Sequence, residues 1–131
     1  MKTLCIVTAA IEAGAGIALL GFPSAVVALL VGAPLESSAG LTVARVGGAG
    51  LLALGLACWL ARNDTRSHAG RGLVAAILLY NIAAVAILAY AGIGLRQHGM
   101  ALWPAVALHA LMAVWCAAAL KRNISQMTIG N

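Results

Sequence analysis

Charged residues are scarce in this chain of 131 residues: eight are basic, three are acidic, and together they make up 8% of the sequence. Soluble domains carry about 25% charged residues, so this composition excludes a water-soluble globular protein. Hydrophobic residues account for 63% of the chain, and the mean hydropathy is +1.03. The sequence therefore predicts an integral membrane protein.

The formal net charge of +5 would suggest nucleic-acid binding in a soluble chain. Here the basic residues fall between long apolar blocks, where they act as topology signals, so we expect no nucleic-acid partner. Lys2 precedes an apolar run in the manner of a signal peptide, but Glu12 interrupts that run and the hydrophobicity continues beyond signal length. We therefore expect the N-terminal segment to be retained.

Cysteine is rare as well. Cys5, Cys58 and Cys116 are odd in number and none belongs to a CxxC pair, which argues against a disulfide framework. The sequence also lacks a Walker-type glycine loop, an HExxH motif and a serine-hydrolase arrangement of Ser, His and Asp. We accordingly expect no catalytic residues and a function other than that of an enzyme.

A bilayer core about 30 Å thick requires roughly 20 apolar residues of helix. Four stretches meet this requirement, and the predicted spans cover residues 4–21, 41–61, 72–95 and 101–120. The first apolar stretch extends to Gly32 but is broken at Gly21-Phe22-Pro23, which predicts a short helix along the interface or a re-entrant turn. The expected fold is an all-α, integral membrane four-helix bundle in one domain, residues 1–122, followed by a frayed polar tail at 123–131.

The loop charges predict the orientation of the chain. One side of the predicted bundle carries only Arg96 and Glu36, whereas the other side carries six basic residues. These six are Lys2, Arg62, Arg66, Arg71, Lys121 and Arg122. By the positive-inside rule, both termini and the tail should face the cytoplasm of a bacterial inner membrane.

Small residues at steps of four predict the faces through which the helices touch, because lipid supplies no hydrophobic drive between them. The second span has a row from Ala49 to Ala61, the fourth has a row from Ala101 to Ala117, and the first has Ala10, Gly14 and Ala18. A second row in the first span passes through Thr8 and Gly16. Abundant alanine and glycine without structural meaning is the alternative interpretation.

Of the charged residues, only Glu12 and Arg45 fall within the predicted spans. A charge inside the bilayer costs from a few to more than ten kcal/mol, so such residues usually face the bundle. Arg45 continues the alanine row of the second span, Glu12 lies on the Thr8 row, and His109 fills the gap in the row of the fourth span. All three are therefore expected to point inward.

Depth follows from the rise of about 1.5 Å per residue, counted from the cytoplasmic end of each span. Glu12, Asn81 and His109 come out roughly 12, 13 and 16 Å deep, so three helices place a polar group on one level. Arg45 comes out roughly 24 Å deep by the same count. That is the predicted level of two aromatic residues of an outward mouth, Tyr90 and Trp103.

Three interpretations of these residues remain open. Glu12, Asn81 and His109 can form a packing network, with Arg45 extending to the interface, in an accessory or scaffold subunit. They can instead form a pocket for a small hydrophobic or amphiphilic molecule such as a quinone or lipid, under Arg45. A proton-linked transporter is the third interpretation. We favour the pocket, in a homo-oligomer or a subunit of a membrane complex surrounded by membrane lipid.

A metal site is a weaker interpretation. His109, Met112 and Cys116 share one helical face, and Cys5 lies on the Glu12 face, so soft ligands on facing helices could hold a thiophilic ion. Cys58 is about 220° around its helix from Arg45, which argues against a site of three thiolates if Arg45 points inward. Buried cysteine is more often a small hydrophobic residue, and we expect no metal.

The order of features resembles that of small four-helix inner-membrane proteins of bacteria, in particular the DoxX-like group. The resemblance consists of Glu12 in the first helix, the break at Gly21-Phe22-Pro23, a short apolar segment to Gly32, and Ala44-Arg45-Val46-Gly47-Gly48 opening the next helix. It covers nearly the whole chain. Some members of that group are similar to subunits that work with quinone-linked oxidoreductases, which implies a quinone as a ligand. Only Arg45-x-x-Gly48 matches as a motif, so the resemblance implies no catalytic residue.

Overall fold

The computed structural model describes residues 1–65 and 67–129, with side chains through residue 122, and this part of the chain is all helical. Four long apolar helices have the length and composition to cross a membrane, as predicted. A short helix follows the first. The helices are α1 (Lys2–Gly21), α2 (Pro23–Val31), α3 (Ser38–Ala61), α4 (His68–Ile93) and α5 (Leu102–Ile129).

The helix boundaries follow from local chemistry. Ser37 and Ser67 cap α3 and α4, because each side chain accepts a hydrogen bond from the backbone N–H three residues later. Pro23 occupies the first turn of α2, where its missing N–H costs nothing. Gly32 ends α2 with a φ of 86°, a left-handed conformation that glycine adopts without a steric penalty.

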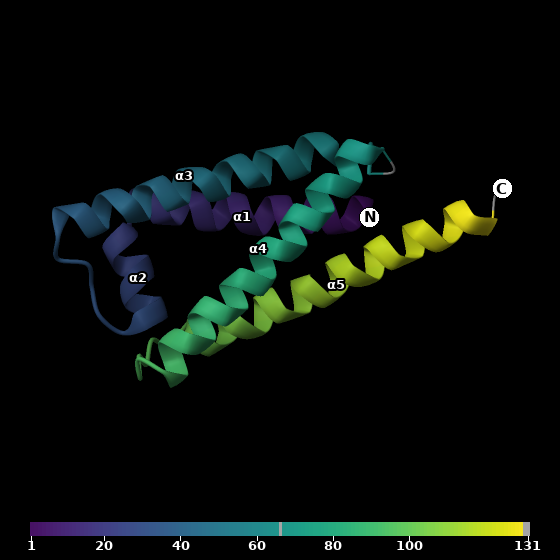
Figure 1. Ribbon diagram of the computed structural model, residues 1–131. Coiled ribbons are helices and arrows are strands. Elements are labelled where there is room, and N and C mark those ends of the chain that lie inside the picture. The colour runs from purple at the N-terminus through teal and green to yellow at the C-terminus, as the bar shows by residue number, and fades with distance from the viewer. Residues whose placement is uncertain (66, 130–131) are drawn as a thin grey trace.

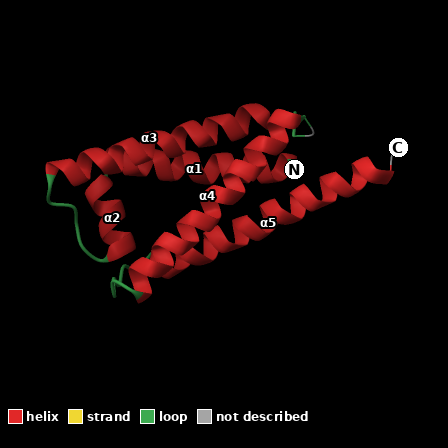
Figure 2. Cartoon of the chain, in the orientation of Figure 1, coloured by secondary structure: helices red, strands yellow, loops and turns green. Residues whose placement is uncertain are grey.

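The long helices form two pairs, α1 with α3 and α4 with α5 (Figures 1 and 2). The two pairs meet in a core near the end that holds the N-terminus. The chain N-terminus, the α3–α4 turn and the far end of α5 lie at this end, and α2 and the α4–α5 loop lie at the other (Figure 1). The core joins α1, α3, α4 and α5 through Leu4, Cys5, Ala9, Cys58, Val74, Ile77, Met112, Cys116 and Ala119.

Glycines rather than alanines make the contact between α1 and α3. A Cβ atom at Gly48 would lie 2.9 Å from the carbonyl oxygen of Gly16, and one at Gly55 would lie 2.9 Å from the backbone nitrogen of Ala13. The two backbones thus touch directly, which only glycine permits. The predicted Thr8 and Gly16 row of α1 is buried here, as expected.

The other predicted contact rows of α1 and α3 are only partly buried within this chain. Ala10 and Gly14 of α1 and Ala49 and Ala53 of α3 are exposed, whereas Ala18, Ala57 and Ala61 are half-buried. An alanine keeps two helix backbones one methyl group further apart than a glycine does. The face of α3 that carries Gly48 and Gly55 therefore packs against α1, and the face that carries Ala49 and Ala53 points outward. The predicted contact row of α5 is buried only in part, because Ala105 is half-buried and Ala117 is exposed.

The short helix α2 lies across the end of the molecule between the two pairs (Figure 1). The Ala101 N–H at the start of the last helical segment donates to the Leu29 carbonyl oxygen at 2.8 Å. Ser24 Oγ both donates to and accepts from the backbone of Leu35, which ties the α2–α3 connection to α2. Gly99 packs directly on the backbone of Leu30, where no side chain would fit. These contacts hold α2 as a cap on the space between the pairs.

The polar tail differs from the expectation. The helix α5 continues beyond Arg122 to Ile129, so most of the segment predicted to be frayed is helical. Residues 130–131 lie outside the described part of the chain, as does Arg66 of the predicted topology signal.

Candidate functional site

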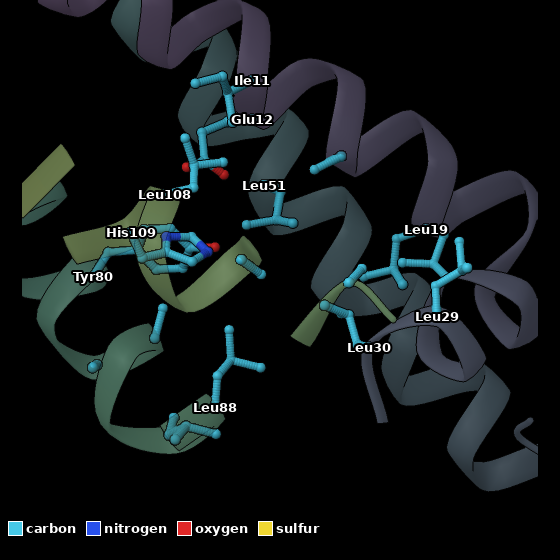
Figure 3. Close-up of a pocket in the computed structure, with 17 residues that line it drawn as sticks. Ile11, Glu12, Leu19, Leu29, Leu30, Leu51, Tyr80, Leu88, Leu108 and His109 are labelled. Atoms are coloured by element: carbon cyan, nitrogen blue, oxygen red, sulfur yellow. The ribbon is translucent and has the colours of Figure 1, made fainter. Parts of the chain in front are cut away.

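A cavity of about 500 Å³ lies between the two helix pairs and under α2 (Figure 3). Its walls come from all five helices, and 14 of the 17 lining residues are apolar. The three exceptions, Glu12, Tyr80 and His109, come from α1, α4 and α5. Cavities of about 300–1,000 Å³ with apolar walls and a few polar groups are typical of small-molecule sites.

Glu12 is the single acidic residue of the cavity wall, and it has no partner in the described part of the chain. Its side chain is 4% exposed and faces the cavity (Figure 3). It makes no hydrogen bond or ion pair with any described residue, and no Lys or Arg lines the cavity. A buried carboxyl group without a partner is costly, so such groups are normally satisfied by something.

His109 is held by Asn81, which lies behind it on α4. Asn81 is buried, its Nδ2 donates to the Ile77 carbonyl oxygen at 2.8 Å, and its Oδ1 lies 2.8 Å from His109 Nδ1. The Ile77 carbonyl can only accept, which fixes the amide orientation and leaves Oδ1 toward the ring. His109 Nδ1 must therefore carry the hydrogen. In the neutral ring, Nε2 is then a free acceptor.

Tyr80 completes the polar end of the cavity. Its ring meets the His109 ring edge to face, with centroids 5.6 Å apart and an interplanar angle of 83°. Tyr80 lines the cavity together with Glu12 and His109 (Figure 3). Tyr80 was not among the residues predicted for the site, whereas Tyr90 was. Tyr80 could have been predicted from its position directly before Asn81, because this position lies at the same depth as Glu12 and His109.

Four residues predicted for the site do not line the cavity: Asn81 lies behind His109, and Arg45, Tyr90 and Trp103 lie elsewhere. Arg45 is exposed on α3 and makes no hydrogen bond or ion pair with the described residues, so the prediction that it points inward is wrong. It begins the outward-turned alanine face, and its long side chain can extend to the lipid headgroups near the start of α3. Tyr90 and Trp103 are 64% and 50% exposed, and neither lines the cavity. Trp103 instead packs beside Gly92.

The three cysteines lie in the core at the other end of the molecule. Cys5, Cys58 and Cys116 come from α1, α3 and α5, are free and fully buried, and pack in one cluster with Met112. The expectation that Cys58 points away from the bundle is wrong, because Arg45, on the other side of α3, is the residue that faces outward. Within the described residues, no group of three or more His, Cys, Asp and Glu is arranged to hold a metal ion.

The Asn81 contact makes a spectroscopic prediction. At alkaline pH, His109 should show the Nδ1–H tautomer in ¹⁵N NMR spectra, and Asn81→Leu should remove that preference because the acceptor is lost. The exposed His68 and His98 provide internal references, and Asn63→Leu in the α3–α4 turn is a matched control. An Nε2–H tautomer in the unmodified protein, or no change in Asn81→Leu, would contradict the assigned hydrogen bond.

The site thus has a polar end and an apolar body. Glu12, Tyr80 and the free nitrogen of His109 offer hydrogen-bonding groups that are unused by the described residues, while leucines and alanines line the rest of the cavity. Such an arrangement can hold the head of an amphiphile and enclose its tail. Comparisons with protein families, curated proteins and solved structures give no match to this chain.

Proposed function

We propose that this multi-pass membrane protein binds a small hydrophobic or amphiphilic molecule, such as a quinone or a lipid, in the cavity between its helix pairs. The observation that carries the proposal is the buried carboxyl group of Glu12, which has no partner among the described residues and faces a cavity of about 500 Å³. A ligand head would supply the missing partner, and the apolar walls would accept its tail.

The packing-network interpretation has less support. It requires Glu12, Asn81 and His109 to satisfy one another, and Asn81 and His109 do form a hydrogen bond. Glu12 takes no part in it, although Glu12 is the residue whose burial is most costly. A purely structural network would leave its most polar member unsatisfied.

The proposed function is tested by the molecules that remain bound to the purified protein. Native mass spectrometry from lipid nanodiscs should detect a bound small molecule on the unmodified protein, and Glu12→Gln combined with His109→Ala should reduce its occupancy. Glu36→Gln is a matched control, because Glu36 is exposed and outside the cavity. If the double variant only lowers thermal stability and changes no bound molecule, the packing interpretation is correct instead.

We also propose that both termini face the cytoplasm of a bacterial inner membrane, on the basis of the loop charges. Single cysteines placed by Asn63→Cys in the α3–α4 turn and Met100→Cys in the α4–α5 loop test this orientation. Both positions are exposed, and the three native cysteines are buried, so background labelling should be low. A membrane-impermeant maleimide should label Met100→Cys in intact cells and Asn63→Cys only after lysis. The reverse pattern would overturn the orientation.

A further inference from the structure

The acidic side chain at the polar end of the cavity favours a cationic ligand over an anionic one. Among the described residues, Glu12 is the only acidic one in the wall, and no Lys or Arg lines it. Arg45, the basic residue in the span of α3, is exposed outside the cavity. An anionic head such as a carboxylate or phosphate would meet a like charge or, at best, no counter-charge in a site of low dielectric constant. A cationic head would be compensated by the Glu12 carboxylate.

The hydrogen-bonding groups of the cavity also favour a ligand with a cationic head. A Glu12 carboxylate only accepts hydrogen bonds, and in the neutral ring Nε2 of His109 is a second acceptor, because Nδ1 already donates to Asn81. The Tyr80 hydroxyl group can donate or accept. The polar end is therefore rich in acceptors and matches a head that carries several N–H donors. A quinone carbonyl, which only accepts, would find a donor in Tyr80 and a second one only if Glu12 is protonated.

The shape of the cavity indicates a tail. The wall continues from Glu12 to Leu19 along α1 and from Tyr80 to Leu88 along α4, a rise of about 10–12 Å in each helix. At the far end, Leu29 and Leu30 of α2 close this apolar channel (Figure 3). The space suits one chain of hydrocarbon directed away from the polar end.

We propose that the ligand of this cavity is a primary ammonium ion with a single apolar tail, whose N–H groups bind Glu12 and His109. This inference rests on the proposed function and narrows its ligand class. The ammonium group supplies three donors and one positive charge, so it satisfies the two acceptors and neutralises the carboxylate. A quaternary ammonium head carries the charge without the donors, and an uncharged alcohol carries one donor without the charge.

The test uses four probes that share a decyl tail: decylammonium, decyltrimethylammonium, decanol and decanoate. Binding to the full chain in phosphatidylcholine nanodiscs is measured by calorimetry below the micellar concentration of the charged probes and below the solubility limit of decanol. The signal from empty nanodiscs is subtracted. We expect decylammonium to bind about tenfold or more tightly than decanol, decyltrimethylammonium to fall between them, and decanoate to bind least.

Single substitutions test which residues cause the preference for decylammonium over decanol. Glu12→Gln should weaken decylammonium binding about tenfold or more and leave decanol binding nearly unchanged, which also shows that the cavity persists. His109→Ala should affect decylammonium more than decyltrimethylammonium, because only the former donates to Nε2. Glu36→Gln, an exposed acid outside the cavity, should change neither. If Glu12→Gln does not fold, the probe series on the unmodified protein still decides the inference.

The outcomes separate the two proposals. Equal binding of decylammonium and decanol, or preference for decanoate, overturns the ammonium inference while the proposed amphiphile site stands. Equal loss of both probes in Glu12→Gln also overturns the inference, because Glu12 would then maintain the cavity rather than recognise charge. Failure of all four probes to bind contradicts the proposed function together with the inference.

Discussion

Replacement of Ala105 by phenylalanine is expected to weaken the binding of decyl probes by roughly 5- to 150-fold, which corresponds to a misfit of about 1–3 kcal/mol. Ala105 lies on α5 one turn before His109, and its side chain lines the cavity. A phenyl ring at this position would occupy the space beside Leu108 and Ala101 that the tail requires. The polar end would keep Glu12, Tyr80 and His109, so loss of binding would report the cavity itself.

The matched control is Ala107→Phe. Ala107 is exposed on the same helix and does not line the cavity, so the added ring would face the membrane and should leave binding unchanged. Thermal unfolding of both variants should remain close to that of the unmodified protein, because each ring enters unoccupied space. Equal affinities in the two variants would mean that ligands do not use the space between the helix pairs.

The second large effect is expected at the contact between α1 and α3. Gly16→Ala should lower the free energy of unfolding by about 1–3 kcal/mol, because the added methyl group meets backbone atoms that cannot move aside independently. A Cβ atom at Gly16 would lie 2.7 Å from both the carbonyl oxygen of Gly48 and the backbone nitrogen of Leu52. The two helices would have to separate along this contact.

Gly14→Ala, in the same helix, should have the opposite effect on stability from Gly16→Ala. No atom lies within 4 Å of a Cβ built at Gly14, so the substitution should raise stability slightly, by up to about 1 kcal/mol, through the higher helix propensity of alanine. Thermal unfolding in nanodiscs, followed by circular dichroism, measures both variants. A destabilisation of the same size in both would show that the Gly16 contact does not hold the pair together.

Much of the fold could be predicted from the sequence because hydrophobic length is a strong signal. The predicted spans and the apolar helices of the structure differ by at most four residues at either end. The break at Phe22-Pro23 and the following short helix are also confirmed. The common depth predicted for Asn81 and His109 from the rise per residue agrees with the hydrogen bond between them.

The inward faces of the helices were less predictable. The alanines of α3 repeat every four residues, whereas Gly48 and Gly55 are seven residues apart, and neither spacing says which face allows the closer backbone approach. Gly48 and Gly55 make the contact with α1. As a result, the side of α3 that carries Arg45 points outward, and Cys58 points inward. The choice of Tyr90 over Tyr80 has the same cause, because it followed the predicted depth of Arg45 rather than that of Glu12.

The central claim is that a ligand enters the space between the helix pairs and meets Glu12. Photoaffinity labelling with a decylammonium analogue that carries a diazirine in its tail, followed by peptide mass spectrometry, tests this claim most directly. We predict adducts on cavity-lining residues such as Leu19, Leu88 and Leu108, suppressed by excess decylammonium. Adducts confined to outward-facing residues such as Leu56, Leu111 and Val114, and insensitive to that competitor, would contradict it.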